Sequence, residues 1–464
     1  MTDGSLLLKQ RLWRWHLLAG LVVCPFAILL SVTGSIYLFK PQIDSYEEAA
    51  INALSPVFEQ ASPEIAPSTH LANLLAKNPQ SNLKRLILAK PGDRTLEIEL
   101  QSAEGEKTIY WIDIASGQIL ASKNSDQRLM QRVKKLHSEL LLGNMGSYVV
   151  ELMASWLIIL IISGLYLWLS KSNNRQEPAK LVVPQFNETK PDKKWRSLHA
   201  VVGFWFTIPM IILLLSGLPW TQLWGSGFDQ VKTIAGWQGP GQEWFVTLQS
   251  EKPQAKRVQI PEASLWQIDS DPHANHGTAA TAGIEALDLG ILDAIRDRPE
   301  VAALIHPVQI APPKPNNGVW TVRSMPSQRS ERETIHFDQY SAQLIKHIRF
   351  KDHHPVEQFV SQGVSLHEGA LFGWLNQLLG VLTALAITCI SGFGLYAWWL
   401  RKPQGKSSVP DRVAAPPSTG LVAGIFLMGI LLPAAGISFV VIYCIEWFST
   451  RAQVKARNIN PPTH

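Results

Sequence analysis

Five long apolar runs, separated by polar stretches, constrain this chain more than any other feature of its sequence. A helix needs about 20 residues to cross the roughly 30 Å hydrocarbon layer of a bilayer. The runs cover residues 17–39, 148–169, 201–218, 374–400 and 419–447. A soluble protein of 464 residues would distribute its apolar side chains more evenly along the chain. The pattern therefore predicts an α-helical integral membrane protein in contact with the lipid bilayer.

Positive charge near the ends of these runs predicts their orientation. Lys and Arg gather before the first run, between the second and the third, and after the fourth. Short cytoplasmic loops carry an excess of such residues, so we expect these regions and the N-terminus to be cytoplasmic. The residues are Lys9, Arg11, Arg14, Lys171, Arg175, Lys180, Lys190, Lys193, Lys194, Arg196, Arg401, Lys402, Lys406 and Arg412. The two long polar segments and the C-terminus are then expected on the opposite side of the membrane.

The overall composition argues against several classes of protein. The net charge is only +5 and the basic residues are scattered, so nothing indicates a nucleic-acid partner. Neither a G-x-G-x-x-G motif nor a P-loop is present, so nothing indicates a nicotinamide, flavin or nucleotide site. The three cysteines, Cys24, Cys389 and Cys444, lie inside apolar runs. The polar segments are therefore expected to fold without disulfide bonds.

The apolar runs repeat each other in pairs. In the first and third, Gly follows a histidine after four positions, and a hydroxyl residue and a second Gly follow at +17 and +18. These positions are His16, Gly20, Thr33 and Gly34, matched by His199, Gly203, Ser216 and Gly217. The second and fourth runs each follow a Leu-His pair with Gly six residues on, and Gly-Leu-Tyr begins 27 positions after each histidine. These positions are His137, Gly143 and Gly164, matched by His367, Gly373 and Gly394.

The two polar segments also correspond to each other. Each has a short helical pattern, then a strand, then a strand, an Asp-led turn and another strand. The helical patterns cover residues 69–76 and 284–298, the first strands 85–88 and 302–305, and the strand-turn-strand patterns 110–120 and 336–345. We therefore expect two copies of a unit made of a span, a small α+β domain and a second span, with a fifth span added at the end. Duplicated units usually pack around a pseudo-two-fold axis, which brings equivalent residues face to face.

Depth in the membrane decides which histidines can meet. His16 and His199 lie at the cytoplasmic start of their spans, whereas His137 and His367 lie where the chain enters the membrane from the other side. A haem iron takes two axial imidazoles on opposite faces of one ring, and the two membrane faces are about 30 Å apart. We therefore predict an inner haem held by His16 and His199 and an outer haem held by His137 and His367. No C-x-x-C-H motif is present, so covalent c-type attachment by that motif is excluded and two b-type haems are expected.

The spacing of the glycines supports these pairs. At 100° per residue, positions +4 and +18 return to nearly the same helix face as the histidine. Gly20 and Gly203 are therefore expected to flank the inner ring, and Gly34 and Gly217 to face the outer one. The glycines at +27 fall on the opposite face of a straight helix, and the pattern gives no reason for them.

Some alternatives remain open at this point. Zinc or copper is the main rival to haem, although four ligands split between two membrane faces cannot form one tetrahedral site. His353 and His354 either replace His367 as the outer ligand or are surface residues. Glu151, about one turn inside the second span, is either a functional intramembrane carboxylate or a hydrated interfacial one.

Two further groups of residues are weaker candidates for ligand binding. Four tryptophans after the third span form either an aromatic mouth for a planar or catecholate substrate or an interfacial belt: Trp220, Trp224, Trp237 and Trp244. Three arginines either attract an anionic ligand or form a solvated hairpin edge: Arg323, Arg329 and Arg332.

Taken together, these residues resemble the PepSY-associated transmembrane family, which includes iron-regulated inner-membrane proteins and periplasmic ferric-siderophore reductases. The similar elements are Trp-x-x-His16 with its repeat at His199, the two Leu-His motifs, Gly-Leu-Tyr-x-Trp at 164–168 and 394–398, Ser216-Gly-Leu-Pro-Trp220, and the turn pattern Asp113-x-x-Ser-Gly-x-Ile-Leu. The resemblance covers almost the whole chain to about residue 403. The chain departs from the pattern at Ala342, which replaces the turn glycine Gly117 of the first repeat, and in its fifth span.

The resemblance implies a multi-pass protein of the bacterial inner membrane with two PepSY-like periplasmic domains. It implies haem b bound by the four histidines and electron delivery to a periplasmic Fe(III) chelate, most simply a ferric siderophore that is reduced to Fe(II). The enzyme class would be an oxidoreductase used in iron acquisition, supplied with electrons by a cytoplasmic partner or by quinol. The alternative is a membrane sensor or peptidase regulator that carries PepSY domains and no haem. A transporter is a third interpretation, although the spans lack the paired charges and broken helices expected of one.

The expected organisation alternates spans with polar segments. Spans with their flanking residues cover 1–39, 136–170, 198–220, 361–400 and 419–447, the periplasmic domains 40–135 and 221–360, the cytoplasmic loops 171–197 and 401–418, and a periplasmic tail 448–464.

Overall fold

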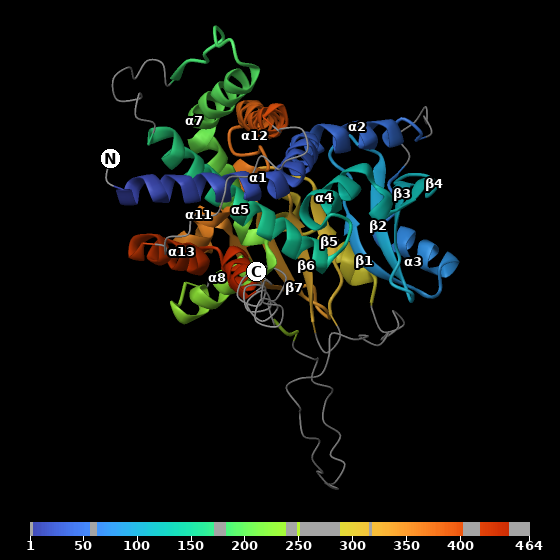
Figure 1. Ribbon diagram of the computed structural model, residues 1–464. Helices are drawn as coiled ribbons and strands as arrows, with labels where there is room; N and C mark the ends of the chain where they lie inside the picture. Colours follow the sequence, from blue (N-terminus) through green and yellow to red (C-terminus); the bar gives the residue numbers. More distant parts are fainter. Residues whose placement is uncertain are drawn as a thin grey trace, which may run out of the picture. The chain divides into compact units, whose positions relative to one another are not determined.

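The computed structural model describes residues 3–55, 63–170, 182–237, 248–250, 288–314, 318–401 and 418–444. The chain divides into two compact units (Figure 1). The helical unit comprises residues 1–43, 129–237 and 359–464, and the sheet unit comprises residues 44–128 and 238–358.

Four helices among the described residues are long and apolar enough to cross a membrane. They are α1 (Asp3–Tyr37), α5 (Asn144–Leu169), α7 (Pro191–Gly217) and α12 (Trp374–Leu400). Large apolar side chains point away from the bundle, and Val22, Ile208 and Leu385 are 59%, 71% and 55% exposed. Apolar side chains in such numbers on the outer surface suit a lipid environment rather than water. Four of the five predicted spans are thus confirmed as helices of sufficient length.

The four long helices pack into one bundle. α12 packs against α7 and α1, and α5 packs against α1 and α7. An apolar cluster in the bundle joins Ala27 of α1, Met210 of α7 and Ile387 of α12. The helices that carry the repeated motifs are therefore neighbours.

Short helices precede or follow the long ones. α2 (Lys40–Asn52) follows α1, α4 (Leu129–Glu139) precedes α5, α8 (Gln222–Ile234) follows α7, and α11 (Pro355–His367) precedes α12. The turns into α5 and α12 pass through Gly143, with φ 59° and ψ −141°, and Gly373, with φ 61° and ψ −138°. Backbone of this kind is essentially limited to glycine. The glycine six residues after each Leu-His motif therefore has a local structural cause.

The predicted fifth span, residues 419–447, is wrong as a single helix. α13 (Thr419–Leu431) ends at Leu432, and a second helix covers Pro433–Cys444. Proline has no backbone N–H and disfavours helical backbone in the residue before it, which explains the break. A Cβ built on Gly436 would lie 2.6 Å from the carbonyl oxygen of Gly429, so the chain bends sharply between the two helices. The predicted tail at 448–464 lies outside the described residues.

The sheet unit contains eight strands in one antiparallel sheet, in the order β4-β3-β2-β1-β5-β6-β7-β8 (Figure 1). The strands are β1 (Ser81–Ile87), β2 (Thr95–Ser102), β3 (Lys107–Asp113), β4 (Ile119–Asn124), β5 (Val308–Ala311), β6 (Val319–Ser324), β7 (Glu333–Asp338) and β8 (Leu344–Arg349). β1 and β5 join the two halves, with Leu86 opposite Ile310 and Ile87 opposite Gln309.

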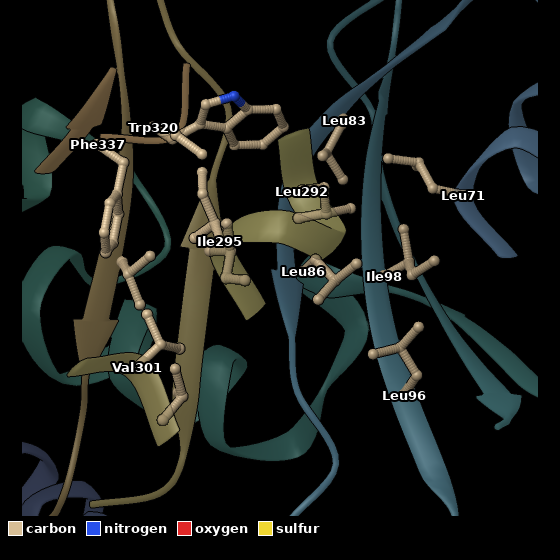
Figure 2. Close-up of a cluster of buried hydrophobic side chains, with 14 of the residues drawn as sticks. Leu71, Leu83, Leu86, Leu96, Ile98, Leu292, Ile295, Val301, Trp320 and Phe337 are labelled. Carbon is tan, nitrogen blue, oxygen red and sulfur yellow. The ribbon is translucent and has the colours of Figure 1, made fainter. Parts of the chain in front are cut away.

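One hydrophobic core runs through both halves of the sheet (Figure 2). It includes Leu71 of α3 (Pro67–Lys77), Ile98 of β2, Ile295 of α9 (Gly290–Arg296) and Trp320 of β6, each essentially inaccessible to solvent. A short helix α10 (Pro299–Ala302) follows α9. The sequence predicted two separate small domains, and that prediction is wrong. The edges of β1 and β5 pair, and the hydrophobic core continues across them.

The sequence predicted some elements of this unit and missed others. The helix at 69–76 is confirmed as α3, and the two strand-turn-strand patterns are confirmed as β3–β4 and β7–β8. The helical pattern at 284–298 is confirmed only as α9, and residues 284–287 lie outside the described residues. The strand predicted at 302–305 is wrong, because α10 ends there and β5 begins at Val308. β2 and β6 were not predicted.

Matching Asp-led turns connect β3 to β4 and β7 to β8. The Asp113 carboxylate accepts hydrogen bonds from the backbone N–H and the hydroxyl of Ser116, at 2.7 and 2.8 Å. Asp338 accepts the corresponding bonds from Ser341, at 2.8 and 2.9 Å. Gly117 and Ala342 have φ of 70° and 53°. The second turn thus forms with alanine in the left-handed conformation that glycine adopts in the first.

Candidate functional site

The helical unit brings the four predicted histidines together as two pairs. His16 of α1 faces His199 of α7, with ring centroids 6.2 Å apart. His137 of α4 faces His367 of α11, with ring centroids 6.4 Å apart. These are the two equal-depth pairs expected from the sequence.

The two pairs lie at opposite ends of the bundle. A Cβ built on Gly164 of α5 would lie 3.0 Å from the His16 ring, and one built on Gly34 of α1 would lie 2.9 Å from the His137 ring. His16 and Gly34 are both on α1, and 18 residues of helix span about 27 Å at 1.5 Å per residue. The separation is close to the thickness of a hydrocarbon layer.

The ring spacing in each pair matches two imidazoles on one metal ion. A ligating imidazole nitrogen lies about 2 Å from a transition metal, and the ring centre lies about 1 Å further away, so two opposed ligands have centroids roughly 6 Å apart. The observed 6.2 and 6.4 Å agree with that arrangement. Among the described residues no three His, Cys, Asp or Glu side chains group as ligands of a bare metal ion. Pairs of this kind fit the axial positions of a macrocycle that supplies the other ligands itself.

Hydrogen bonds define the tautomer of the inner pair. His199 Nδ1 lies 2.8 Å from the carbonyl oxygen of Ile390, which can only accept, so Nδ1 carries the proton. His16 Nδ1 lies 2.9 Å from the hydroxyl of Ser163, and that hydroxyl donates its own proton to the Leu160 carbonyl at 3.2 Å. The hydroxyl therefore accepts from His16. In both rings Nε2 keeps its lone pair, as a ligand of metal requires.

The outer pair follows the same rule. His367 Nδ1 donates to the Leu213 carbonyl at 2.9 Å and lies 3.2 Å from the Ser216 hydroxyl, which itself donates to Leu213. His137 Nδ1 lies 3.0 Å from the hydroxyl of Thr33, and that hydroxyl donates to the Leu29 carbonyl at 2.9 Å. All four histidines are thus held in the tautomer with Nε2 unprotonated. Thr33 and Ser216 are the hydroxyl residues found at +17 in the sequence.

The outer histidines, which lie on α4 and α11 outside the four long helices, are also kept uncharged. Desolvation, followed by the proximity of His367, lowers the pKa of His137 to about 4. Desolvation likewise lowers the pKa of His367. Only a neutral imidazole has the free lone pair that binds a metal. The outer pair is therefore in its ligating form at physiological pH.

Four glycines let the imidazoles pack against helix backbone. Gly34 and Gly217 contact His137 and His367, as the Cβ positions built on them lie 2.9 and 3.1 Å from those rings. Gly164 and Gly394 contact His16 and His199 in the same way, at 3.0 and 3.1 Å. The glycines at +27, for which the sequence gave no reason, thus pack against the histidines of the inner pair. Gly34 and Gly217 lie at the same end of the bundle as the His137–His367 pair, as expected, and they contact the imidazoles themselves.

Gly20 and Gly203 behave differently from these four. Among the described residues, a Cβ built on either would have no atom of another part of the chain within 4 Å. Each lies one helical turn beyond the histidine of the inner pair, on the same face. The prediction that they flank the inner ring is compatible with this placement.

A family model described as the PepSY-associated TM region matches residues 13–401. The chain belongs to the PepSY-associated transmembrane family. The match includes all four histidines, α5, α7, α12, the part of α1 from Trp13 onward and the whole sheet unit. Together with the four apolar helices, membership of the family makes this a membrane protein. A comparison with curated proteins found no match.

The alternative outer ligands are not needed in this family member. His353 pairs with Glu357, with Nδ1 3.3 Å from the carboxylate, and His354 Nδ1 accepts the N–H of Val356 at 3.3 Å. The ring opposite His137 is that of His367.

Glu151 has a structural role. It is fully buried, and its carboxylate accepts the backbone N–H groups of Leu223 and Trp224 at 2.8 and 3.0 Å. Both residues lie in the first turn of α8, where unpaired N–H groups and the positive end of the helix dipole favour a carboxylate. Glu151 therefore fixes α8 to α5, and the hydrated interfacial placement is wrong.

The weaker substrate candidates do not gather into one site. Trp224 packs into an apolar cluster with Ile158 and Leu218 and stacks on Phe228. Trp220 and Trp237 are exposed, and Trp244 lies outside the described residues. Arg323 is buried in the central strand β6, so the solvated hairpin edge is wrong for it. Arg329 and Arg332 lie half-buried at the turn before β7.

Sequence reasoning missed one residue of the site, Ser163. It directly precedes Gly164 in the Gly-Leu-Tyr motif, whereas the matching copy has Phe393 before Gly394. That departure between otherwise matching motifs was the available signal. His199 reaches the Ile390 carbonyl directly where His16 reaches a hydroxyl.

Proposed function

We propose that this protein is a di-haem b oxidoreductase that carries electrons through the inner membrane to a periplasmic acceptor, an Fe(III) chelate of the siderophore class. The observation that carries the proposal is the pair of opposed imidazole couples, 6.2 and 6.4 Å apart, with every Nδ1 engaged. When bound, haem supplies reversible one-electron chemistry at its iron.

The chain contributes position and surroundings to that chemistry. The four Nε2 atoms would bind the haem irons, with His16 and His199 at the end where basic residues predict the cytoplasm. The hydrogen bonds at Nδ1 fix ring orientation and raise the basicity of each ligand. The apolar helices between the pairs exclude water. Two sites at opposite ends of one bundle suit a relay across the membrane.

The acceptor is proposed from chemistry and from family resemblance. Hard oxygen donors bind Fe(III) more tightly than Fe(II), because the interaction grows with the charge of the ion. One electron therefore loosens a siderophore's hold on iron. The chain has no nicotinamide, flavin or nucleotide motif, so its electrons are expected from a cytoplasmic partner or from quinol.

A visible spectrum of the purified protein tests the cofactor claim. We expect a Soret band and an α band that respond to dithionite, and a haem-to-protein ratio near two. His16→Ala and His137→Ala should each remove about half of the haem, and the double variant nearly all of it. His347→Ala, in a histidine of β8 that bonds Glu333, is the matched control and should keep both haems. A folded protein without haem would overturn the proposal.

The acceptor claim needs a separate measurement. Ferric siderophore added to the dithionite-reduced protein, after removal of excess reductant, should oxidise the haem, and a ferrous chelator should report Fe(II). Haem that stays reduced would refute the acceptor and leave transmembrane electron transfer standing.

One observation favours the second candidate, a PepSY regulator that binds a partner protein. The sheet unit has a cavity of about 250 Å³ whose lining includes Glu64, Lys90, Arg296 and His306. Ligand sites for drug-sized molecules have volumes of about 300–1,000 Å³. The cavity suits a side chain or a chain terminus of a partner better than it suits a ferric siderophore. A colourless, folded protein would favour this function.

A further inference from the structure

The two histidine pairs are nearly equal in spacing and differ in ring orientation. The planes of His16 and His199 cross at 89°, whereas those of His137 and His367 cross at 56°. Rotation of each ring about its Cβ–Cγ bond is limited by the hydrogen bond at Nδ1. The cause of the difference is therefore to be found in the atoms that accept those bonds.

The acceptors of the inner pair differ between its two members. Gly164 and Gly394 correspond, so Ser163 corresponds to Phe393 and Leu160 to Ile390. His199 donates directly to the Ile390 carbonyl, whereas the Ser163 hydroxyl stands between His16 and the Leu160 carbonyl. The His199 ring thus bonds a main-chain oxygen, whereas the His16 ring bonds a hydroxyl that in turn bonds a main-chain oxygen.

In the outer pair both rings have a hydroxyl beside Nδ1. Thr33 serves His137 and Ser216 serves His367, and the two positions correspond in the repeated motif. Phe393 has no such group, and its ring packs against Trp195 with centroids 5.2 Å apart. The direct carbonyl bond without an accompanying hydroxyl is therefore particular to His199 among the four.

Ring orientation has an electronic consequence at a bound metal. The π orbital of an axial imidazole overlaps one of two d orbitals that are otherwise equal in energy, and the plane of the ring selects which one. Perpendicular rings act on both d orbitals alike and leave them nearly degenerate. Rings at a smaller angle raise one above the other. Hydrogen bonding at Nδ1 adds to this by increasing electron donation from the ring.

We infer that Ser163 is a positioning residue that holds His16 perpendicular to His199 and thereby gives the inner haem a ligand field and a reduction potential distinct from those of the outer haem. This inference rests on the proposed function. Ser163 acts through the His16 ring and touches neither the metal nor the acceptor.

Electron paramagnetic resonance of the oxidised holoprotein, together with a redox titration, tests the role. Two low-spin ferric signals are expected, one nearly axial from the inner haem and one rhombic from the outer. Ser163→Ala should make the axial signal rhombic and leave the other unchanged. It should also shift the potential of the inner haem, because His16 Nδ1 would then have to turn to the Leu160 carbonyl, as His199 Nδ1 turns to the Ile390 carbonyl. The expected change in the oxidised-to-reduced ratio is about tenfold, equal to about 59 mV for one electron.

Two further variants make the result specific. Ser163→Thr keeps the hydroxyl and should restore the axial signal and the potential. Thr388→Val removes a hydroxyl of α12 that donates to a carbonyl of its own helix, at Ala384, and should change neither. If Ser163→Ala loses haem, the electron paramagnetic resonance spectrum of Ser163→Thr still tests the positioning role.

The two possible failures are distinguishable. Bound haem with both signals and both potentials unaltered in Ser163→Ala would overturn the positioning role and leave the proposed function intact. A purified protein without haem would overturn both.

Discussion

The imidazole of His137 packs directly on the backbone of Gly34, and a Cβ built on that glycine would lie 2.9 Å from His137 Cε1. Contacts this close leave no room for a side chain, because well-packed interiors yield little. The corresponding glycine Gly217 stands in the same relation to His367, at 3.1 Å.

Replacement of Gly34 by valine should displace His137 and leave the inner pair intact. We expect the haem-to-protein ratio of the purified protein to fall from about two to about one, with the axial resonance signal retained. Gly227→Ala on α8 is the control, since a Cβ there would meet no atom from another described part of the chain within 4 Å. Full retention of both haems in Gly34→Val would show that the ring does not need this contact.

Removal of the Glu151 carboxylate should loosen α8. Glu151→Ala leaves the N–H groups of Leu223 and Trp224 unpaired in an apolar setting, which costs about 1–3 kcal/mol for a buried polar group. Amide hydrogen exchange in peptides from α8 should rise by one to two orders of magnitude. Ser226→Ala, which removes an exposed hydroxyl of the same helix, should have no such effect. Unchanged exchange in Glu151→Ala would mean that α8 is held by its apolar contacts alone.

The Asp-led turns should make the sheet unit sensitive to acid. Burial by itself raises the pKa of Asp113, but hydrogen bonds from Ser55, Ser116 and Ala115 outweigh it and leave the pKa below its ordinary value. The pKa of Asp338 is lowered in the same way, against the effect of burial. A carboxyl whose pKa is lower in the folded state stabilises the fold above its unfolded value, about 3.9, and this stabilisation is lost as pH falls through the folded value.

Hydrogen exchange in peptides from β3 and β4 should therefore accelerate below about pH 4 beyond the intrinsic pH dependence of exchange. Asp113→Asn should remove part of that acceleration. The buried Glu97 works in the opposite sense, because burial raises its pKa and protonation favours the folded state as pH falls through the raised value. For this reason the difference between the native chain and Asp113→Asn is the quantity to measure. An equal acid response in the two proteins would contradict the role of the turn.

The two turns should also respond oppositely to exchange of their left-handed residues. Gly117→Ala should destabilise the sheet unit by about 1–2 kcal/mol, the cost of an L-residue in that conformation. Ala342→Gly relieves the same cost but removes a buried methyl group worth about 0.8 kcal/mol, so its net effect should be a gain of at most about 1 kcal/mol. Thermal unfolding, followed by amide hydrogen exchange in peptides from each half of the sheet, measures whether each variant gains or loses stability. A larger loss in Ala342→Gly than in Gly117→Ala would refute the argument.

The sequence was most informative where position along a helix translates directly into depth. His16, His199, His137 and His367 were paired correctly because the repeat and the membrane thickness leave one arrangement. The Gly164 contact was missed because it joins two different helices, and helix periodicity describes only one. Pro433 indicates that the last apolar run is broken, because proline lacks a backbone N–H. The mean hydropathy of the run does not reflect that missing group.

The sheet was harder to derive for a related reason. The sequence of β2 alternates apolar and polar residues, and Leu96, Ile98 and Leu100 face the core. This pattern was available in the sequence, but β2 was not predicted from it. Pairing between β1 and β5 involves residues more than 200 positions apart, and no local pattern marks which strand edges will meet. The membrane helices needed only composition and length, whereas the sheet needed a long-range partner.

The seam between β1 and β5 has a practical consequence for anyone dissecting this protein. A fragment that ends after the first half would keep β1 with its N–H and C=O groups open along one side, and the second half would expose β5 in the same manner. Open edges of this kind recruit other chains. Separately expressed halves should therefore pair with each other when mixed and precipitate when kept apart.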